Sequence, residues 1–312
     1  MNENKNNYVD VDEIDLRELF LAIWIKKYFI FVFTTIFAIS SVTYALMLPN
    51  IYTSKSILAP VAAEESLSSK LGSFSSLASI SGINLPTDGS SNTKEAIERI
   101  KSFEFFSIYF LPNIKLENIT AIKKWDPINN RIIYDDSIFN KDTNKFEENA
   151  YFRSNNGNPS KQEAFKIYKD ILSISQNSET QFITLSIKHM SPIIAKKWVD
   201  IIIYNINKSM REEDEEKAKN AINYLNESAG STNIQSLKEA ISGLLEGQMQ
   251  ILMLAASNEH YVLEILDSPI VPEEKSEPGR AFISIIGTIL GSLISILIVL
   301  ISYFIRRDDS IK

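Results

Sequence analysis

The chain contains no cysteine and only two histidines among its 312 residues. The absence of cysteine excludes disulfides, thiol catalysis and thiolate metal sites. The sequence also has neither the G-x-x-x-x-G-K-[ST] loop of nucleotide phosphate sites nor the G-x-S-x-G turn of serine hydrolases. Positive charge is not in excess either, because the formal net charge is −7. This charge argues against a nucleic-acid-binding protein.

The remaining polar residues do not form a catalytic pattern. His189 and His260 each lie beside a predicted strand, and a metal site or triad would need further partners that the sequence does not supply. The acidic run within 211–219 places Glu213 and Glu215 four residues before lysines. This spacing is typical of weak ion pairs on a solvated helix face, or of pairing between subunits, rather than of two catalytic carboxylates. We therefore predict no catalytic residue, no cofactor and no metal, and a protein that is not an enzyme.

Two long charge-free apolar runs dominate the sequence instead. Each is long enough to cross a bilayer as a helix, which needs about 20 apolar residues. A cleaved signal peptide is disfavoured for the first run, since an acid-rich tail precedes it and no small-residue cleavage site follows it. We expect an N-terminal tail at 1–27, a first span at 28–48, a large domain at 49–280, a second span at 281–305 and a C-terminal tail at 306–312.

The basic residues that flank the two runs predict their orientation. Lys26 and Lys27 precede the first run, and Arg306 and Arg307 follow the second. Because Lys and Arg are retained on the cytoplasmic side, both termini are expected in the cytoplasm and the large domain outside it. Arg280, at the outer edge of the second run, is a counter-signal, and its long side chain can reach the headgroups.

The large domain is predicted to be α+β, with a long helical arm. A helix over Pro192–Ser228 would be about 55 Å long at 1.5 Å per residue. A capping box at Thr232–Gln235 is expected to begin a second helix after a break at Gly230. Shorter elements are expected as strands at Ile51–Leu58, Arg131–Tyr134, Phe182–Ile187 and Tyr261–Leu266, and as helices at Lys94–Leu111 and from the capping box Ser160–Glu163 to about Leu172. Because the domain begins and ends at the membrane, its first and last strands are expected to lie near each other.

Two segments have more than one interpretation. The stretch from Asp15 to Ile23 is amphipathic and is either an interfacial helix, or a bundle contact or frayed helix end. Ser66–Asn92 is rich in serine and glycine but carries apolar residues at regular steps. It is either a flexible loop or a partly ordered insertion.

The second run and its approach contain the candidate site residues. Small residues recur every four positions in the run, a spacing that lets helices approach closely, although such residues are common in membrane helices anyway. The partner of this face is either the first span or a neighbouring subunit. Proline favours a stiff, extended approach to the run. The candidates for packing or partner contact are Pro269, Pro272, Pro278, Arg280, Gly287, Gly291 and Ser295.

This layout resembles the Wzz-type polysaccharide co-polymerases, the chain-length determinants of lipopolysaccharide O-antigen. The resemblance covers essentially the whole chain and depends on the order of several individually weak motifs. These are Val11–Leu16 and Trp24–Lys27 before the first span, Tyr52–Pro60 after it, Ser191–Trp198 at the long helix, and the proline, arginine and glycine positions before and within the second span. Gly279 departs from the family, which often has a basic or polar residue before the arginine.

The resemblance implies a non-catalytic homo-oligomer in the bacterial inner membrane, a ring that is often an octamer, with a periplasmic domain. It implies action with the O-antigen polymerase, and contact with lipid-linked polysaccharide. Partner contacts are expected in the spans, with the Leu71–Leu85 segment as a second candidate. The short tail after Ile305 differs from the kinase-bearing exopolysaccharide relatives and favours the O-antigen branch. A capsule or exopolysaccharide export component, a transmembrane sensor and a periplasmic hydrolase are the alternatives.

Overall fold

The computed structural model describes residues 16–61, 89–147 and 158–309. The chain divides into two compact units: residues 1–49 with 277–312, and residues 50–276. Each unit is described by itself. The predicted cap at Asp15 and most of the 66–92 segment, including Leu71–Leu85, lie outside the described residues.

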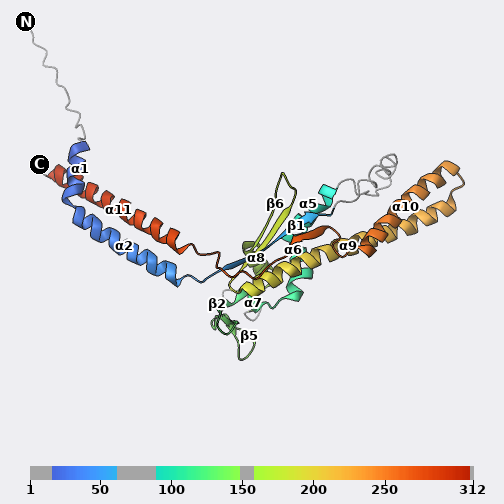
Figure 1. The fold of residues 1–312 in the computed structure, drawn as a ribbon, viewed down its shortest axis with the longest axis horizontal. Helices are drawn as coiled ribbons and strands as arrows, with labels where there is room; N and C mark the ends of the chain where they lie inside the picture. Colours follow the sequence, from blue (N-terminus) through green and yellow to red (C-terminus); the bar gives the residue numbers. More distant parts are fainter. Residues whose placement is uncertain (1–15, 62–88, 148–157, 310–312) are drawn as a thin grey trace, which may run out of the picture. The chain divides into compact units, whose positions relative to one another are not determined.

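The first unit is helical. Helix α1 (Leu16–Ile25) ends at a turn on Lys26, α2 (Lys27–Met47) follows, and α11 (Arg280–Asp309) lies alongside α2 (Figure 1). Both α2 and α11 are long and apolar enough to cross a membrane. Only 6% of the apolar window in α2 and 17% of that in α11 is buried, far less than in the core helix of a soluble protein.

The second unit contains a four-stranded antiparallel sheet in the order β6-β7-β1-β8. Its strands are β1 (Tyr52–Pro60), β6 (Leu172–Gln176), β7 (Ile183–His189) and β8 (Leu263–Asp267). Pairing of β1 with β8 confirms that the first and last strands of the domain lie together. Because β1 separates β7 from β8, the strands next to the two histidines do not pair. Strand β6 was not predicted, since its serines and lone glutamine lack a long apolar run.

Helices and aromatic side chains cover the sheet and form the core. The single helix expected over Lys94–Leu111 is wrong in detail, because the helix is interrupted at Ser102. The Ser102 side-chain oxygen accepts a hydrogen bond from the Phe105 backbone N–H at 3.1 Å. The hydroxyl of the fully buried Tyr168 donates to the Ile100 carbonyl oxygen at 2.9 Å. The elements here are α5 (Gly89–Lys101), α6 (Phe103–Phe105), the π-helix η1 (Phe106–Phe110), the 3₁₀-helix η2 (Leu111–Asn113) and α8 (Lys161–Ile171).

Several local predictions for this unit are confirmed. Ser160 and Glu163 form the predicted capping box at the start of α8, with both reciprocal bonds present. The expected strand at Arg131–Tyr134 is β3. It pairs with β2 (Ile122–Asp126), which follows a short helix, α7 (Glu117–Thr120), and a second small hairpin joins β4 (Phe139–Asn140) to β5 (Lys145–Phe146).

A pair of long helices extends from the sheet region of this unit (Figure 1). Helix α9 (Pro192–Ser231) is about 60 Å long, and α10 (Gln235–Ser257) returns alongside it. The predicted break at Gly230 is wrong, because the helix continues through this residue. The predicted capping box at Thr232–Gln235 is also wrong: Ile234 is the N-cap of α10, and no side chain caps it.

A buried asparagine in α9 fixes where the chain re-enters the sheet. The Asn207 side-chain oxygen accepts from the backbone N–H groups of Val262 and Leu263 at 2.8 and 3.0 Å. Its amide nitrogen donates to the Leu263 carbonyl oxygen at 3.0 Å and to that of Ile203 at 3.1 Å. This 2% exposed side chain therefore uses all of its polar capacity, and three of its four hydrogen bonds join α9 to Val262 and Leu263 at the start of β8.

Candidate assembly site in the terminal helix pair

The small residues predicted in the second apolar run share one face of α11. Gly291 and Ser295 are buried, and Gly287 is half-buried. The face continues one step further to Val299, which is 5% exposed and was not among the predicted residues. The four-residue spacing of these positions therefore marks a continuous packing stripe along α11.

The partner of this stripe within the chain is α2. A Cβ built on Gly291 would lie 2.5 Å from Phe37 Cβ and 2.9 Å from its Cγ. A Cβ built on Gly287 would overlap the Ser41 side chain. Glycine is required at both positions because the two helices approach too closely for any larger residue.

The start of α11 is joined to the end of α2 by a polar contact. The Arg280 Nε donates a hydrogen bond to the Ala45 carbonyl oxygen at 3.1 Å. Ala45 is only 1% exposed, so it continues the contact face of α2 beyond Ser41. The side chain of Arg280 therefore has a structural partner inside the first unit, in addition to any contact with headgroups.

The proline-rich approach is divided between the two units. Pro278 belongs to the helical unit, where the Glu277–Pro278 peptide bond is cis. Pro269 and Pro272 belong to the sheet unit, and Pro269 is buried there. The structure thus brings together Arg280, Gly287, Gly291 and Ser295, but not the first two prolines with them.

Within the sheet unit, the segment that contains Pro269 is attached to β1 by serine side chains. Ser56 Oγ donates to the Asp267 carbonyl oxygen at 2.6 Å, and Ser54 Oγ donates to that of Ile270 at 2.8 Å. Further along, Ser276 N donates to the Ile51 carbonyl oxygen at 2.8 Å. The first and last residues of the unit therefore lie side by side. The sequence did not predict these serine hydrogen bonds, because serines in a strand carry no distinctive sequence signal.

Among the described residues of the sheet unit, the buried histidine has structural partners. His189 Nε2 lies 2.9 Å from the Asn118 carbonyl oxygen, and its Nδ1 accepts from Ser191 N at 2.9 Å. Burial lowers the pKa of His189, although these backbone hydrogen bonds oppose the shift. The ring also contacts Trp198 edge-on, so the histidine fills the core where α9 begins.

The acidic run of α9 makes the ion pairs that its spacing predicts. Glu213 pairs with Lys217 at 2.7 Å, and Glu215 pairs with Lys219 at 3.3 Å. Glu213 also pairs with Arg99 of α5, which connects the two helices. Its hydrogen bonds to Arg99 and then to Lys217 lower the pKa of Glu213. These partly exposed contacts are those of a structural helix face.

One carboxylate of the run is different, because it faces the start of β8. Asp214 accepts a hydrogen bond from the Tyr261 hydroxyl at 2.8 Å. Burial raises the pKa of Asp214, while this hydrogen bond acts in the opposite direction. Within residues 16–61, 89–147 and 158–309, no group of three His, Asp or Glu side chains is arranged to hold a metal ion.

In the sequence, two apolar helices that are each long enough to cross a membrane flank an α+β domain with a helical arm. Residues 12–110 match the family model described as Wzz, chain length determinant protein. The match covers 99 of the 312 residues and confirms the resemblance found in the sequence. Members of this family are regulators of chain length rather than catalysts.

Two solved structures resemble this chain at low sequence identity. No curated protein matches the chain. A structure described as a full-length bacterial polysaccharide co-polymerase is 14% identical, with a TM-score of 0.41, and the match covers 94% of this chain and 99% of that one. A fragment of WzzB, a polysaccharide co-polymerase from Salmonella Typhimurium, is also 14% identical, with a TM-score of 0.31 and coverage of 73% and 100%.

Proposed function

We propose that this chain sets the length of the O-antigen of lipopolysaccharide, as a non-catalytic ring of identical subunits in the bacterial inner membrane. The observation that carries the proposal is the Wzz match over residues 12–110, which contains the first apolar helix and the first strand of the domain. In the proposed topology both termini are cytoplasmic, residues 49–280 are periplasmic, and 28–48 and 281–305 span the membrane. The lysines and arginines that flank the spans support this orientation.

The packing of the spans indicates where a membrane partner can bind. Because Gly287 and Gly291 contact α2 in the same chain, the opposite faces of the two helices are left for other proteins. Ile36 and Ile39 of α2 are 56% and 62% exposed, and Ile289 of α11 is 54% exposed. We place the contacts with the O-antigen polymerase, with neighbouring subunits and with lipid-linked polysaccharide on these faces.

Deletion of the gene, followed by electrophoresis of the lipopolysaccharide, tests the proposal. The ladder should broaden while polymerisation continues, and the full-length chain should restore the modal length. An unchanged ladder would reject the O-antigen assignment. Analysis of capsule or exopolysaccharide size in the same strain then tests the main alternative, and cleavage of glycan by the purified protein would instead support the hydrolase.

The lack of native cysteine makes the topology easy to test. Ile128 lies at the turn between β2 and β3 and is 91% exposed, so Ile128→Cys creates one accessible thiol without disturbing the core. A membrane-impermeant maleimide should label this thiol in spheroplasts, and should label Asn7→Cys in the N-terminal tail only after lysis. The reverse pattern would contradict the proposed orientation.

A further inference from the structure

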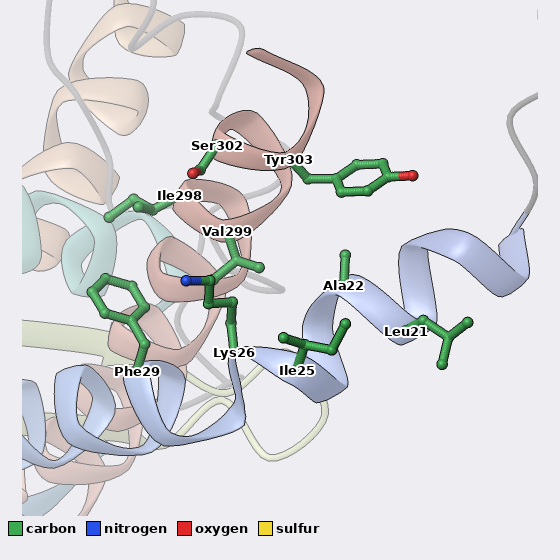
Figure 2. A pocket seen from close by; sticks show the side chains of 9 residues that line it. All are labelled: Leu21, Ala22, Ile25, Lys26, Phe29, Ile298, Val299, Ser302 and Tyr303. Carbon is green, nitrogen blue, oxygen red and sulfur yellow. The ribbon is translucent and has the colours of Figure 1, made fainter. Parts of the chain in front are cut away.

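A pocket in the helical unit lies where α1 and the start of α2 face the end of α11 (Figure 2). Its volume is about 550 Å³. It is lined by Leu21, Ala22, Ile25, Lys26, Phe29, Ile298, Val299, Ser302 and Tyr303. The pocket is separate from the glycine contact, since Gly287 and Gly291 lie further toward the beginning of α11.

The lining combines apolar walls with one cationic group and two hydroxyls. The Lys26 side chain extends from the turn between α1 and α2 toward the α11 side of the pocket (Figure 2). Ser302 and Tyr303 contribute the hydroxyl groups, and none of the lining residues is acidic. Among the residues that the structure describes, no carboxylate lines the pocket beside this cation, so the lining favours a negatively charged ligand.

The residues around the pocket are those that favour a membrane–water interface. Trp24 and Tyr28 are 59% and 76% exposed, and the Lys27 ammonium lies 4.8 Å from the centre of the Trp24 ring. Exposed tryptophan and tyrosine rings with neighbouring lysines are enriched at the headgroup level. Helix α1 also exposes Phe20 and Ile25, as expected of an amphipathic helix that lies in the interface.

We propose that this pocket binds an anionic phospholipid of the inner leaflet, with its phosphate at Lys26 and an acyl chain between α1 and α11. The inference rests on the orientation in the proposed function, which places the pocket at the cytoplasmic face. Charge complementarity selects this occupant, because basic pockets between membrane helices on that face hold acidic headgroups. The bound lipid connects α1 to α11 and thereby fixes the angle at which the chain enters the membrane.

Lipid retention by the purified full chain tests the proposal. Native mass spectrometry would count the lipids kept after addition of phosphatidylglycerol, or of phosphatidylcholine with the same acyl chains. The wild type should retain phosphatidylglycerol preferentially. Lys26→Gln should weaken that retention by about fivefold, the effect expected of one lysine near an anionic headgroup. Lys27→Gln is the matched control, because it removes the same charge from the next residue, which does not line the pocket.

A second pair of variants tests the apolar part of the pocket. Ser302→Trp should fill it and abolish retention of phosphatidylglycerol, whereas Ile301→Trp adds bulk at a 56% exposed position of α11 outside the lining and should not. The proposal is wrong if both lipids are retained equally, if Lys26→Gln and Lys27→Gln behave alike, or if Ser302→Trp changes only the number of subunits. That last result would assign the pocket to a second copy of the chain.

The lipid measurement is independent of the polymer-length measurement. Selective retention of phosphatidylglycerol with an unchanged lipopolysaccharide ladder would reject the proposed function and leave the lipid site standing. A broadened ladder in the deletion strain without selective retention would reject only the lipid site.

Discussion

Gly291 of α11 lies directly against the Phe37 side chain of α2, with no space for a Cβ between them. The glycine is needed for its lack of a side chain, since it stands in the middle of a helix whose backbone conformation any residue other than proline adopts readily. The aromatic ring and the glycine together set the distance between the two apolar helices. The length of the side chain at position 291 should therefore control how closely α2 and α11 pack.

Substitution of Gly291 by Leu should force the helix pair apart. Overpacking of this kind costs about 1–3 kcal/mol, so the melting temperature of the purified full chain should fall. We also expect the lipopolysaccharide ladder to broaden, because the spans are the proposed partner surface. The double variant Phe37→Ala with Gly291→Leu returns space to the contact and should regain part of the stability. A wild-type melting temperature and ladder for Gly291→Leu alone would refute this role.

Asn207→Ala should be one of the most destabilising single substitutions in the sheet unit. It deprives the N–H groups of Val262 and Leu263 and the Leu263 carbonyl of their side-chain partner. Each unsatisfied buried group costs about 1–3 kcal/mol, so the free energy of unfolding should fall by about 3 kcal/mol or more. Asn205→Ala is the control, because that side chain bonds the Ile201 carbonyl within its own helix. Equal losses for the two variants would show that Asn207 does not hold β8.

His189 should make the stability of the chain depend on pH in the acid range. Its pKa in the folded state is lowered, mainly by burial, below the value of about 6.5 in an unfolded chain. The unfolded state therefore binds the proton more readily. The contribution of the neutral ring is fully present above about pH 6.5 and is lost as the pH falls toward the folded-state pKa.

Thermal unfolding between about pH 7.5 and pH 5 checks this prediction, since the range brackets the ordinary pKa of histidine. The melting temperature of the wild type should decrease toward the acid end, and His189→Asn should flatten that decrease while lowering stability at the neutral end. A slope unaffected by His189→Asn would assign the acid sensitivity to other groups.

Asp214 should tolerate loss of its charge but not loss of its hydrogen bond. Burial opposes ionisation of this carboxyl, while Tyr261 donates to it at 2.8 Å. Asp214→Asn keeps an acceptor for the hydroxyl and should leave the melting temperature at neutral pH unchanged or slightly higher. Asp214→Ala removes the acceptor and should cost about 1 kcal/mol, the usual net contribution of one hydrogen bond. Similar losses in both variants would mean that the negative charge itself is stabilising.

Local chemistry explains which elements could be predicted from the sequence. The capping box of Ser160 and Glu163, the proline at the start of α9 and the alternating apolar residues of β7 each involve neighbours in the chain. Such signals act over a few residues and need no knowledge of the fold. The same holds for the two apolar runs, whose length alone indicates a membrane span.

The helix boundaries at Gly230 and Ser102 were predicted wrongly for different physical reasons. Gly230 lies inside α9, and a Cβ built on it would meet nothing within 4 Å, so nothing there requires the helix to break. Ser102 interrupts the helix predicted over Lys94–Leu111, and the aromatic residues after it pack as a cluster around Tyr168. Packing within the domain therefore outweighs local propensity after Ser102, whereas at Gly230 the local signal is only a weak preference that the helix tolerates.

The sequence by itself determined the two apolar helices, the α+β domain between them, the absence of cysteine chemistry and the small-residue stripe of α11. Only the tertiary structure decided that this stripe meets Phe37 and Ser41, that Asn207 holds β8, and that Lys26 lies in a pocket beside α11. The reason is how far apart in the sequence the interacting residues lie. Periodicity and capping depend on residues a few positions apart, whereas these contacts join residues separated by tens to hundreds of positions, and no local pattern encodes which of them will meet.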